Sequence, residues 1–487
     1  MGDETTPLSP AEARHLLRRT GFGAQKKDVD RILLLDKTRG RAADRLLNFR
    51  STPFRPNGSE FPNAHNKWIK YLTIARSPLQ EKLVLFWHDH FATAISKVAD
   101  VGLMADQIQL LHERCKGNFK DLVKAINVNP AMMEFLDTVR NDKDVPNENY
   151  ARELQELFTL GVDDTNGNPN YTQEDIVQIA RAFTGWGYDR GKAVLDEGNH
   201  DFMADFPARG PKVIYQSTGG FGSGGRSFTV NGEGTAEIDT VIDIIFAHRD
   251  SNGRNTVARR TARRLLEYFA HPNPDTAVVD AVVAQSGFGS SPDSWDVGAL
   301  VRAILVHDAF YETGAAAPFG AQTKKSVKWP IDYVVSTLRL LGMRLKGRDQ
   351  YVDGGSFRAA LDGLSDMGQV LLDPPSVFGW DWETSWISSA ALLARYGFAR
   401  DVTSARGHGT TAFRPERLID LNLTDPAAIV DAVLGVLGIP DQLTDGEKTT
   451  LVNYLTENGT KAVDLHDGVK ANGLFALVLQ SPAYQLH

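Results

Sequence analysis

The chain has 487 residues, with 42% hydrophobic and 23% charged residues, which is typical of a globular protein and argues against wholesale disorder. Its net charge is −8, and no Lys/Arg tract is longer than pairs such as Arg259-Arg260 and Arg263-Arg264, which argues against nucleic-acid binding. The single cysteine, Cys115, excludes an internal disulfide and a thiolate metal cluster.

The first ten residues are polar and acidic, and they lack the basic and apolar regions of a signal peptide. We therefore expect either a cytoplasmic protein or an exported protein in its mature form. No stretch approaches the roughly 18 apolar residues that a membrane-spanning helix needs, so we expect no transmembrane segment.

Several helix starts are marked by capping sequences. Ser9-Pro10-Ala11-Glu12 combines an N-cap serine, a proline at the first helical position and a glutamate three residues after the cap. Starts of the same kind occur at Ser77, Thr172 and Thr444. Apolar residues recur at helical spacing after these starts, and alternating strand patterns are scarce. The sequence therefore predicts an all-α, multi-helix fold of bundle-like architecture.

One region departs from this helical pattern. Residues 187–236 are rich in glycine and contain short β-favouring pieces such as Val213-Ile214-Tyr215, which predicts an irregular insertion with a hairpin. We therefore expect four regions: an N-terminal helical domain over 1–186, this insertion, a second helical region over 237–410 with a linker at 314–322, and a C-terminal helical segment over 411–487.

The first candidate for chemistry is the histidine-rich segment EKLVLFWHDHF, residues 81–91. Imidazole titrates near neutrality and binds metals, but His88 and His90 lie about 200° apart on a helix and cannot grip one ion together. Glu81 and His88, two turns apart, share a face. One interpretation directs His88 and Glu81 toward a polar site while His90 donates into the core. The other makes both histidines hydrogen-bonded core residues.

The second candidate is the segment NENYARELQELFTLG, which Asn147 begins and is expected to cap. Glu153 lies at the edge of the apolar arc, so we expect partial burial together with a partner or a raised pKa. Glu156 lies on the same side, and Arg152 is placed to pair with it. Two carboxylates on one flank suit metal ligation or acid–base catalysis, and equally a buried ion-pair network with Arg152 or Arg181.

The third candidate is the loop DPPSVFGWDWETSW, which two adjacent prolines stiffen. Its indoles and carboxylates could form a stacking platform for a glycan or another planar partner. These residues are Trp380, Asp381, Trp382, Glu383 and Trp386. Tryptophans in such a loop also serve as plugs between helices.

Six segments of the chain resemble, in order, a bacterial family, domain of unknown function 1800 (DUF1800). They are HLLRRTGFG (15–23), EKLVLFWHDHFAT (81–93), PNENYARELQELFTLG (146–161), YTQEDIVQIARAFTGW (171–186), KWPIDYVVSTLRLLG (328–342) and MGQVLLDPPSVFGW (367–380). The resemblance implies a mainly helical fold and supplies no settled activity. Many members carry export signals or are encoded beside sulfatase-like proteins, which implies a sulfatase-like partner.

Two features bear on how closely the chain follows the family pattern. Asp89 stands where the family often has asparagine between the two histidines. The resemblance also implies a His-Asp pair in the glycine-rich insertion, for which His200-Asp201 is the candidate match. A site that uses this pair would be altered here if the match fails.

Two functional hypotheses follow from these motifs. The first is an enzyme, a hydrolase or an oxidoreductase, with a His/carboxylate site between two helices. Glu153 would act as base or ligand, His88 as its partner, and Glu81 and Glu156 in support. This hypothesis predicts that His88, Glu153 and Glu156 converge on one water-accessible pocket, where they could also bind a divalent metal ion.

The enzyme hypothesis further assigns Asn147 and Arg152 to ligand binding. The second hypothesis is a non-catalytic binding or assembly protein. Its polar motifs would be structural ion pairs, and it would contact a glycan or protein partner through Trp380, Trp382 and Trp386.

Overall fold

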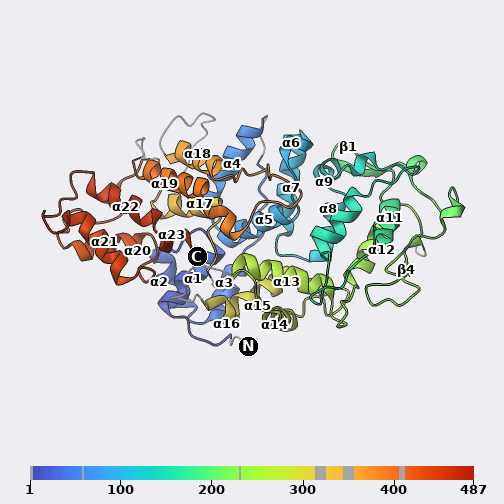
Figure 1. The fold of residues 1–487 in the computed structure, drawn as a ribbon, viewed down its shortest axis with the longest axis horizontal. Coiled ribbons are helices and arrows are strands. Elements are labelled where there is room, and N and C mark those ends of the chain that lie inside the picture. Colours follow the sequence, from blue (N-terminus) through green and yellow to red (C-terminus); the bar gives the residue numbers. More distant parts are fainter. Residues whose placement is uncertain (1–3, 57–59, 230–231, 313–324, 344–355, 405–411) are drawn as a thin grey trace.

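The computed structural model describes residues 4–56, 60–229, 232–312, 325–343, 356–404 and 412–487. These residues form an elongated molecule built almost entirely of helices (Figure 1), which confirms the predicted helical fold. The predicted linker at 314–322 lies outside the described residues, as does most of the loop before Pro415.

The helices of the first 186 residues are α1 (Pro10–Thr20), α2 (Lys26–Leu35), α3 (Arg39–Leu47), α4 (Phe61–Ile74), α5 (Pro78–His90), α6 (Ile95–Val98), α7 (Val101–Arg114), α8 (Phe119–Asn127), α9 (Pro130–Phe135), η1 (Thr138–Arg140), α10 (Asn149–Glu153), the π-helix η2 (Leu154–Thr159) and α11 (Gln173–Ala182).

The helices that follow are η3 (Glu197–Asn199), η4 (Pro207–Arg209), α12 (Thr235–Phe246), α13 (Thr256–Phe269), α14 (Thr276–Ser286), α15 (Val297–Val306), α16 (Asp308–Tyr311), α17 (Pro330–Leu340), α18 (Ser356–Asp366), η6 (Glu383–Ile387) and α19 (Ser389–Thr403). The last ones are η8 (Pro415–Arg417), α20 (Pro426–Val436), α21 (Asp445–Thr456), α22 (Lys470–Gln480) and α23 (Pro482–Gln485).

Local capping sets several of these helix starts. Ser9, Thr172 and Thr444 form capping boxes at the starts of α1, α11 and α21, as predicted. In each box the side-chain oxygen accepts from an amide of the first turn that has no partner within the helix. α5 also begins directly after Ser77, but the Ser77 side chain makes no capping hydrogen bond.

The glycine-rich insertion contains two short antiparallel hairpins, where the sequence predicts one. β1 (Trp186–Asp189) pairs with β2 (Lys192–Leu195), and β3 (Val213–Ile214) pairs with β4 (Arg226–Ser227). The insertion lies near α11 and α12 at one end of the molecule, and α20 to α22 form the opposite end (Figure 1).

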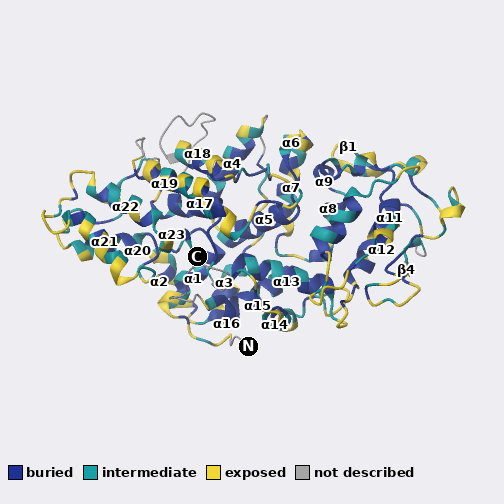
Figure 2. Cartoon of the chain, in the orientation of Figure 1, coloured by how far each residue is buried: buried dark blue, intermediate teal, exposed yellow. Residues whose placement is uncertain are grey.

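α5 runs through the middle of the molecule and is buried along its length (Figure 2). Glu81, Lys82 and Asp89 are buried along with the apolar residues of this helix. A helix usually turns its polar side chains to solvent, so each of these groups must find a partner inside the protein. These buried polar groups and their partners lie in the middle of the molecule and are described below.

The first helix of the chain, α1, contacts the turn between α20 and α21. Arg14 of α1 pairs with Asp441 at 3.0 Å, and Arg18 donates to the carbonyl of Gly438 at 3.1 Å. These contacts join the predicted regions 1–186 and 411–487, whose boundaries stay a prediction. None of the helices in the described ranges is long and apolar enough to cross a lipid bilayer.

Candidate functional site

Both histidines of α5 are neutral core residues. His88 is fully buried against two tryptophan rings, and its Nε2 accepts from the backbone N–H of Leu372 at 3.1 Å. His90 Nε2 donates to the carbonyl of Phe158 at 3.1 Å, as predicted for a histidine that donates into the core. Burial lowers the pKa of each imidazole to about 3, so neither is charged at neutral pH.

Glu81 lies against a different histidine, His112. Oε2 of the buried Glu81 is 3.6 Å from Nε2 of His112. Burial raises the pKa of Glu81 to about 8, an effect that Arg339 opposes. Burial also lowers the pKa of His112 to about 3. The two groups therefore form a neutral carboxylic acid beside a neutral imidazole at pH 7.

The carboxylate helix changes form along its length. α10 continues directly into the π-helix η2, and π-turns occur frequently at functional sites. At the entry, Asn147 accepts from the backbone N–H of Asn149 at 2.9 Å. Glu153 and Glu156 are half-buried. Burial, and then the charge of Glu156, raises the pKa of Glu153, which confirms the expectation of a raised pKa.

Arg152 does not pair with Glu156, so that prediction is wrong. Its guanidinium pairs with Glu148, one turn earlier, at 3.0 Å. Glu156 instead accepts a hydrogen bond from the hydroxyl of Tyr171 at 3.1 Å. The partner of Glu156 is therefore a tyrosine hydroxyl and not the guanidinium of Arg152.

The histidine helix α5 and the carboxylate helix meet at the backbone of the π-helix η2. The last carbonyls of a helix have no donor within the helix and need one from elsewhere. Arg260 of α13 donates to the carbonyls of Glu156 and Leu157 at 2.8 and 3.3 Å. His90 of α5 supplies the donor for the carbonyl of Phe158. Side chains from α5 and α13 therefore hold this helix end.

The structure does not bring His88 together with Glu153 and Glu156. Nε2 of His88 already accepts from Leu372, and Glu156 already accepts from Tyr171. Within the described part of the chain, no three His, Cys, Asp or Glu side chains are arranged to hold a metal ion. His88 is enclosed in the core, whereas the two glutamates lie on a partly exposed helix flank.

The tryptophan loop folds down onto α5. Asp89 accepts from the backbone N–H of Trp380 at 2.8 Å and from the indole N–H of Trp382 at 3.2 Å. Trp380 and Trp386 are buried. Trp382 is half-buried, with the guanidinium of Arg264 over its ring at 4.3 Å. The loop fills the space between helices, and of its three indoles only Trp382 is partly open to a ligand.

A small polar cavity lies beside this loop, and the sequence analysis did not find it. Its volume is about 10 Å³, enough for about one water molecule. It is lined by Glu267 and Tyr268 of α13, Glu383 of η6, Arg19 of α1 and Asp332 of α17. Segments from both halves of the sequence therefore converge on one water-sized space.

The two glutamates of this cavity differ in their surroundings. Burial raises the pKa of both. Three arginines of α13 oppose this effect at Glu267, with Arg264 the first among them at 3.9 Å. Glu383 accepts from the N–H of Val327 at 3.2 Å, but the adjacent charge of Glu267 adds to the effect of burial. The charge of Arg19 also lowers the pKa of Glu383, so nearby cations oppose the effect of burial at both glutamates.

Buried charges support the cavity. Lys82 of α5 pairs with Asp332 at 2.6 Å, both almost fully buried. Burial alone would raise the pKa of Asp332, but Lys82 holds it well below its usual range. Arg19 donates to the carbonyls of Tyr268 and Phe269, each at 2.6 Å. A buried ion pair contributes little to stability compared with apolar packing, whereas perturbed titratable groups around a cavity are typical of functional sites.

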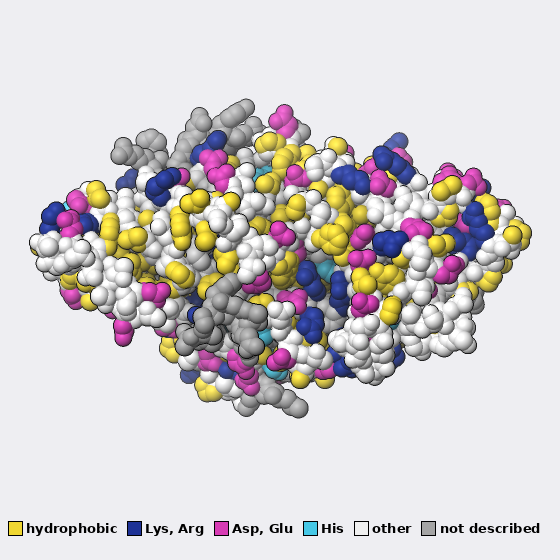
Figure 3. All heavy atoms as spheres, viewed as in Figure 1, with side chains coloured by type: hydrophobic (Ala, Val, Ile, Leu, Met, Phe, Trp, Pro, Cys, Tyr) yellow, Lys and Arg dark blue, Asp and Glu magenta, His cyan; other side chains and the backbone are white. Residues whose placement is uncertain are grey.

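The surface above this cavity is charged. Lys and Arg side chains gather near the middle of the face shown in Figure 3, over α13, with acidic side chains around them. α13 contributes the half-buried Arg260, Arg263, Arg264 and Glu267. A ligand that approaches the cavity along α13 would therefore meet polar rather than apolar groups.

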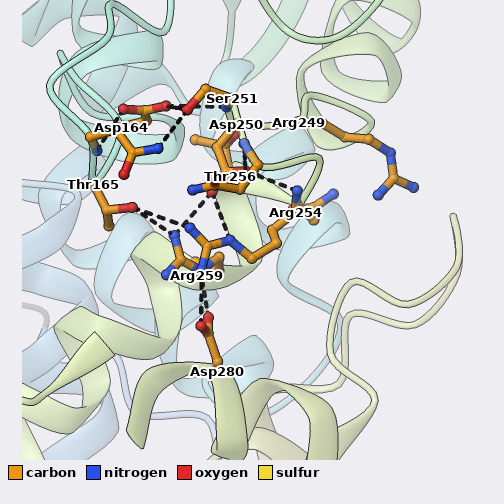
Figure 4. Close-up of polar contacts among 12 residues, drawn as sticks. Asp164, Thr165, Arg249, Asp250, Ser251, Arg254, Thr256, Arg259 and Asp280 are labelled. Atoms are coloured by element: carbon orange, nitrogen blue, oxygen red, sulfur yellow. Dashed lines mark hydrogen bonds and ion pairs between the residues drawn. The ribbon is translucent and has the colours of Figure 1, made fainter. Parts of the chain in front are cut away.

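A second polar cluster is closed on itself (Figure 4). Arg259 pairs with Asp250 at 3.1 Å and with Asp280 at 2.6 Å. Arg254 pairs with the same two carboxylates at 3.2 and 3.0 Å. Two cations and two anions neutralise one another here, so these four residues offer no net charge to a ligand.

His200 and Asp201 are both buried in the glycine-rich insertion. Asp201 pairs with Arg181 at 3.0 Å and with Arg209 at 2.7 Å. His200 Nε2 lies 3.2 Å from the carboxylate of Glu237. The ion-pair network that includes Arg181 therefore forms with Asp201 and not with the glutamates of the π-helical segment.

The sequence carried a usable signal for part of the central cavity. In segments that carry the family resemblance, Asp332 lies within a run of apolar residues, and Lys82 directly precedes such a run. A charged residue in such a run is buried together with its helix and needs a partner. No local pattern indicates that Glu267 and Glu383 meet, because only the packing of α13 against the tryptophan loop brings them together.

Taken together, the fold and this cavity define a predominantly α-helical protein with a small polar cavity lined by the half-buried Glu267 and Glu383. The family model described as "Protein of unknown function (DUF1800)" matches residues 15–486, and the chain belongs to this family. No curated protein and no solved structure matches the chain.

Proposed function

We propose that the protein is a hydrolase whose acid–base pair consists of Glu267 and Glu383. The observation that carries this proposal is that both residues line one water-sized cavity. Hydrolysis needs a base that takes a proton from water and an acid that protonates the leaving group. Two carboxyls whose surroundings separate their pKa values can divide these roles.

We assign the two roles by the number of cations near each carboxyl, three arginines at Glu267 and one at Glu383. Glu267, beside the arginines of α13, is the base that accepts a proton from the attacking water. Glu383, next to the charge of Glu267, is the acid that donates its proton to the leaving group. The hydroxyl of water bonds to the electrophilic atom while the bond to the leaving group breaks. Proton exchange with solvent then restores both carboxyls.

Residues around the cavity would orient the substrate. Arg264 presents planar N–H donors to substrate oxygens, and Trp382 beside it offers an apolar surface. Arg260 lies one turn before Arg264 on α13 and donates to a carbonyl of the helix that carries Glu153 and Glu156. We assign these two glutamates to binding a remote part of the substrate rather than to proton transfer.

The test is turnover of a panel of p-nitrophenyl esters, glycosides and phosphates by the intact chain. For the class that is hydrolysed, we expect Glu267→Gln and Glu383→Gln to lower kcat by about 10²-fold or more, the usual contribution of acid–base catalysis. Glu113→Gln, a change at an exposed glutamate of α7, is the matched control.

The pH profile of kcat/KM separates a proton-transfer role from a structural one. Loss of the base should remove the acidic limb of the profile, and loss of the acid should remove the alkaline limb. Absence of turnover across the panel, or equal rates in wild type and both variants, would refute the proposal and favour the non-catalytic binding hypothesis.

A further inference from the structure

A large cleft opens among the N-terminal helices, away from the acid–base cavity. Its volume is about 830 Å³, within the roughly 300–1,000 Å³ that small-molecule sites occupy. It is lined by the end of α1, by α2 and α3, by the turn before α5 and by Arg339 of α17. None of these lining residues also lines the acid–base cavity.

The cleft carries positive charge that the described residues do not neutralise. Arg31, Arg41 and Arg76 line it and are exposed. Their guanidinium groups make no hydrogen bond or ion pair with any residue in the described ranges. Arg339 donates to the carbonyls of Leu72 and Ala75 at 3.0 and 3.2 Å.

Most of the acidic residues in the cleft are already committed. Asp36 accepts from Nε of Arg45 through both carboxylate oxygens, at 2.6 and 2.7 Å. Asp44 accepts from Arg302, which does not line the cleft, at 2.6 and 3.3 Å. Asp28 is the one lining carboxylate without an ion pair to a described residue. The cleft is therefore cationic, although the whole chain has a net charge of −8.

The floor of the cleft is apolar and shaped by glycine. Phe22, between Gly21 and Gly23, lines the cleft together with other apolar side chains of the N-terminal helices. Gly23 has φ +87°, and a Cβ there would lie 2.9 Å from the side chain of Leu340. The segment that ends α1 can therefore pack directly against α17, which closes the floor.

We infer that this cleft binds a small organic anion that carries a phosphate or another multiply charged oxyanion on an apolar body. Guanidinium groups match oxyanions because their planar N–H donors can bind two oxygens at once. The three unpaired guanidinium groups carry three positive charges, whereas a single carboxylate on the ligand carries one negative charge. A multiply charged oxyanion therefore balances the charge of the cleft better. The apolar side chains that also line the cleft would contact the rest of the ligand. This inference is independent of the proposed hydrolase.

The experiment is isothermal titration of the intact chain with phenylphosphonate, inorganic phosphate and benzamide. Phenylphosphonate has both the oxyanion and the apolar ring, and each of the others has one of them. We expect saturable binding of phenylphosphonate, weaker binding of phosphate and weakest binding of benzamide. Added salt should weaken the binding because the cationic groups are exposed.

A triple variant tests the arginines. Combining Arg31→Gln, Arg41→Gln and Arg76→Gln should weaken phenylphosphonate binding about tenfold or more, because each exposed ion pair contributes up to about 1 kcal/mol. The matched control removes three exposed arginines elsewhere, through Arg190→Gln, Arg249→Gln and Arg417→Gln. It should leave the affinity within about twofold of wild type.

Three outcomes overturn the inference. They are absence of saturable binding by the wild type, equal weakening in both triple variants, and equal affinity for inorganic phosphate and phenylphosphonate. If thermal unfolding shows that the cleft triple variant does not fold, the three single variants replace it. Each should then weaken binding about threefold.

Discussion

Glu81 makes the stability of the protein depend on pH. Burial raises its pKa from 4.5 to about 8, so the folded protein holds a proton that the unfolded chain releases above pH 4.5. The stabilisation from this proton is complete below pH 4.5 and is lost as the pH rises to about 8. At about 1.4 kcal/mol per pH unit, the interval between these two values corresponds to about 5 kcal/mol above pH 8.

Glu81→Gln should remove this dependence, because glutamine has the same shape and stays neutral. Between pH 5 and pH 8 we expect the free energy of unfolding of the wild type to fall by about 3–4 kcal/mol relative to the variant. His112, the neighbouring imidazole, has a pKa of about 3 and stays neutral over this range. The difference between the two proteins therefore reports Glu81 itself.

Urea denaturation at pH 5, 6, 7 and 8 measures the effect, and Glu113→Gln on the surface of α7 serves as control. The control should follow the wild type at every pH. Parallel curves for wild type and Glu81→Gln would refute the reasoning, because they would show that the buried carboxyl releases its proton at the same pH in both states.

Two further substitutions test the packing around the acid–base cavity. Gly379→Ala should lower the free energy of unfolding by about 2 kcal/mol or more, because Gly379 has φ +81° and a Cβ there would lie 2.7 Å from the carbonyl oxygen of Asp89. An unchanged urea midpoint would contradict this. Lys82→Met should cost about 3–5 kcal/mol, because Asp332 would lose its lysine partner in the core and keep only His487 at 3.6 Å. Adding Asp332→Leu should recover much of that loss, and a double variant no more stable than the single one would count against the ion-pair argument.

Local sequence signals predicted the architecture and several contacts. The capping boxes set helix starts, and the apolar spacing around His90 predicted that it donates into the core. The predicted pair of Arg152 with Glu156 failed because Arg152 has an acidic residue four positions away on each side. Glu148 precedes Arg152, and a glutamate four residues before the basic residue is the favoured helical arrangement.

Local sequence patterns could not predict the cavity that Glu267 and Glu383 line. Glu267 and Glu383 come from a helix and a loop that meet only in the folded chain. The sequence selected Glu153 and Glu156 because both lie on one helix, where periodicity can be read directly. Periodicity places residues on faces of a single helix, but it does not say which faces of distant helices meet.

The π-helical turn also determines how this part of the molecule can move. Its last carbonyls are bonded to Arg260 and His90, so the turn cannot unwind without breaking hydrogen bonds to α13 and α5. Its amides should therefore exchange with solvent only when all three helices open together as one cooperative unit. We therefore expect the main chain around Glu153 and Glu156 to keep its shape, so that adaptation to a ligand there would come from rotation of side chains.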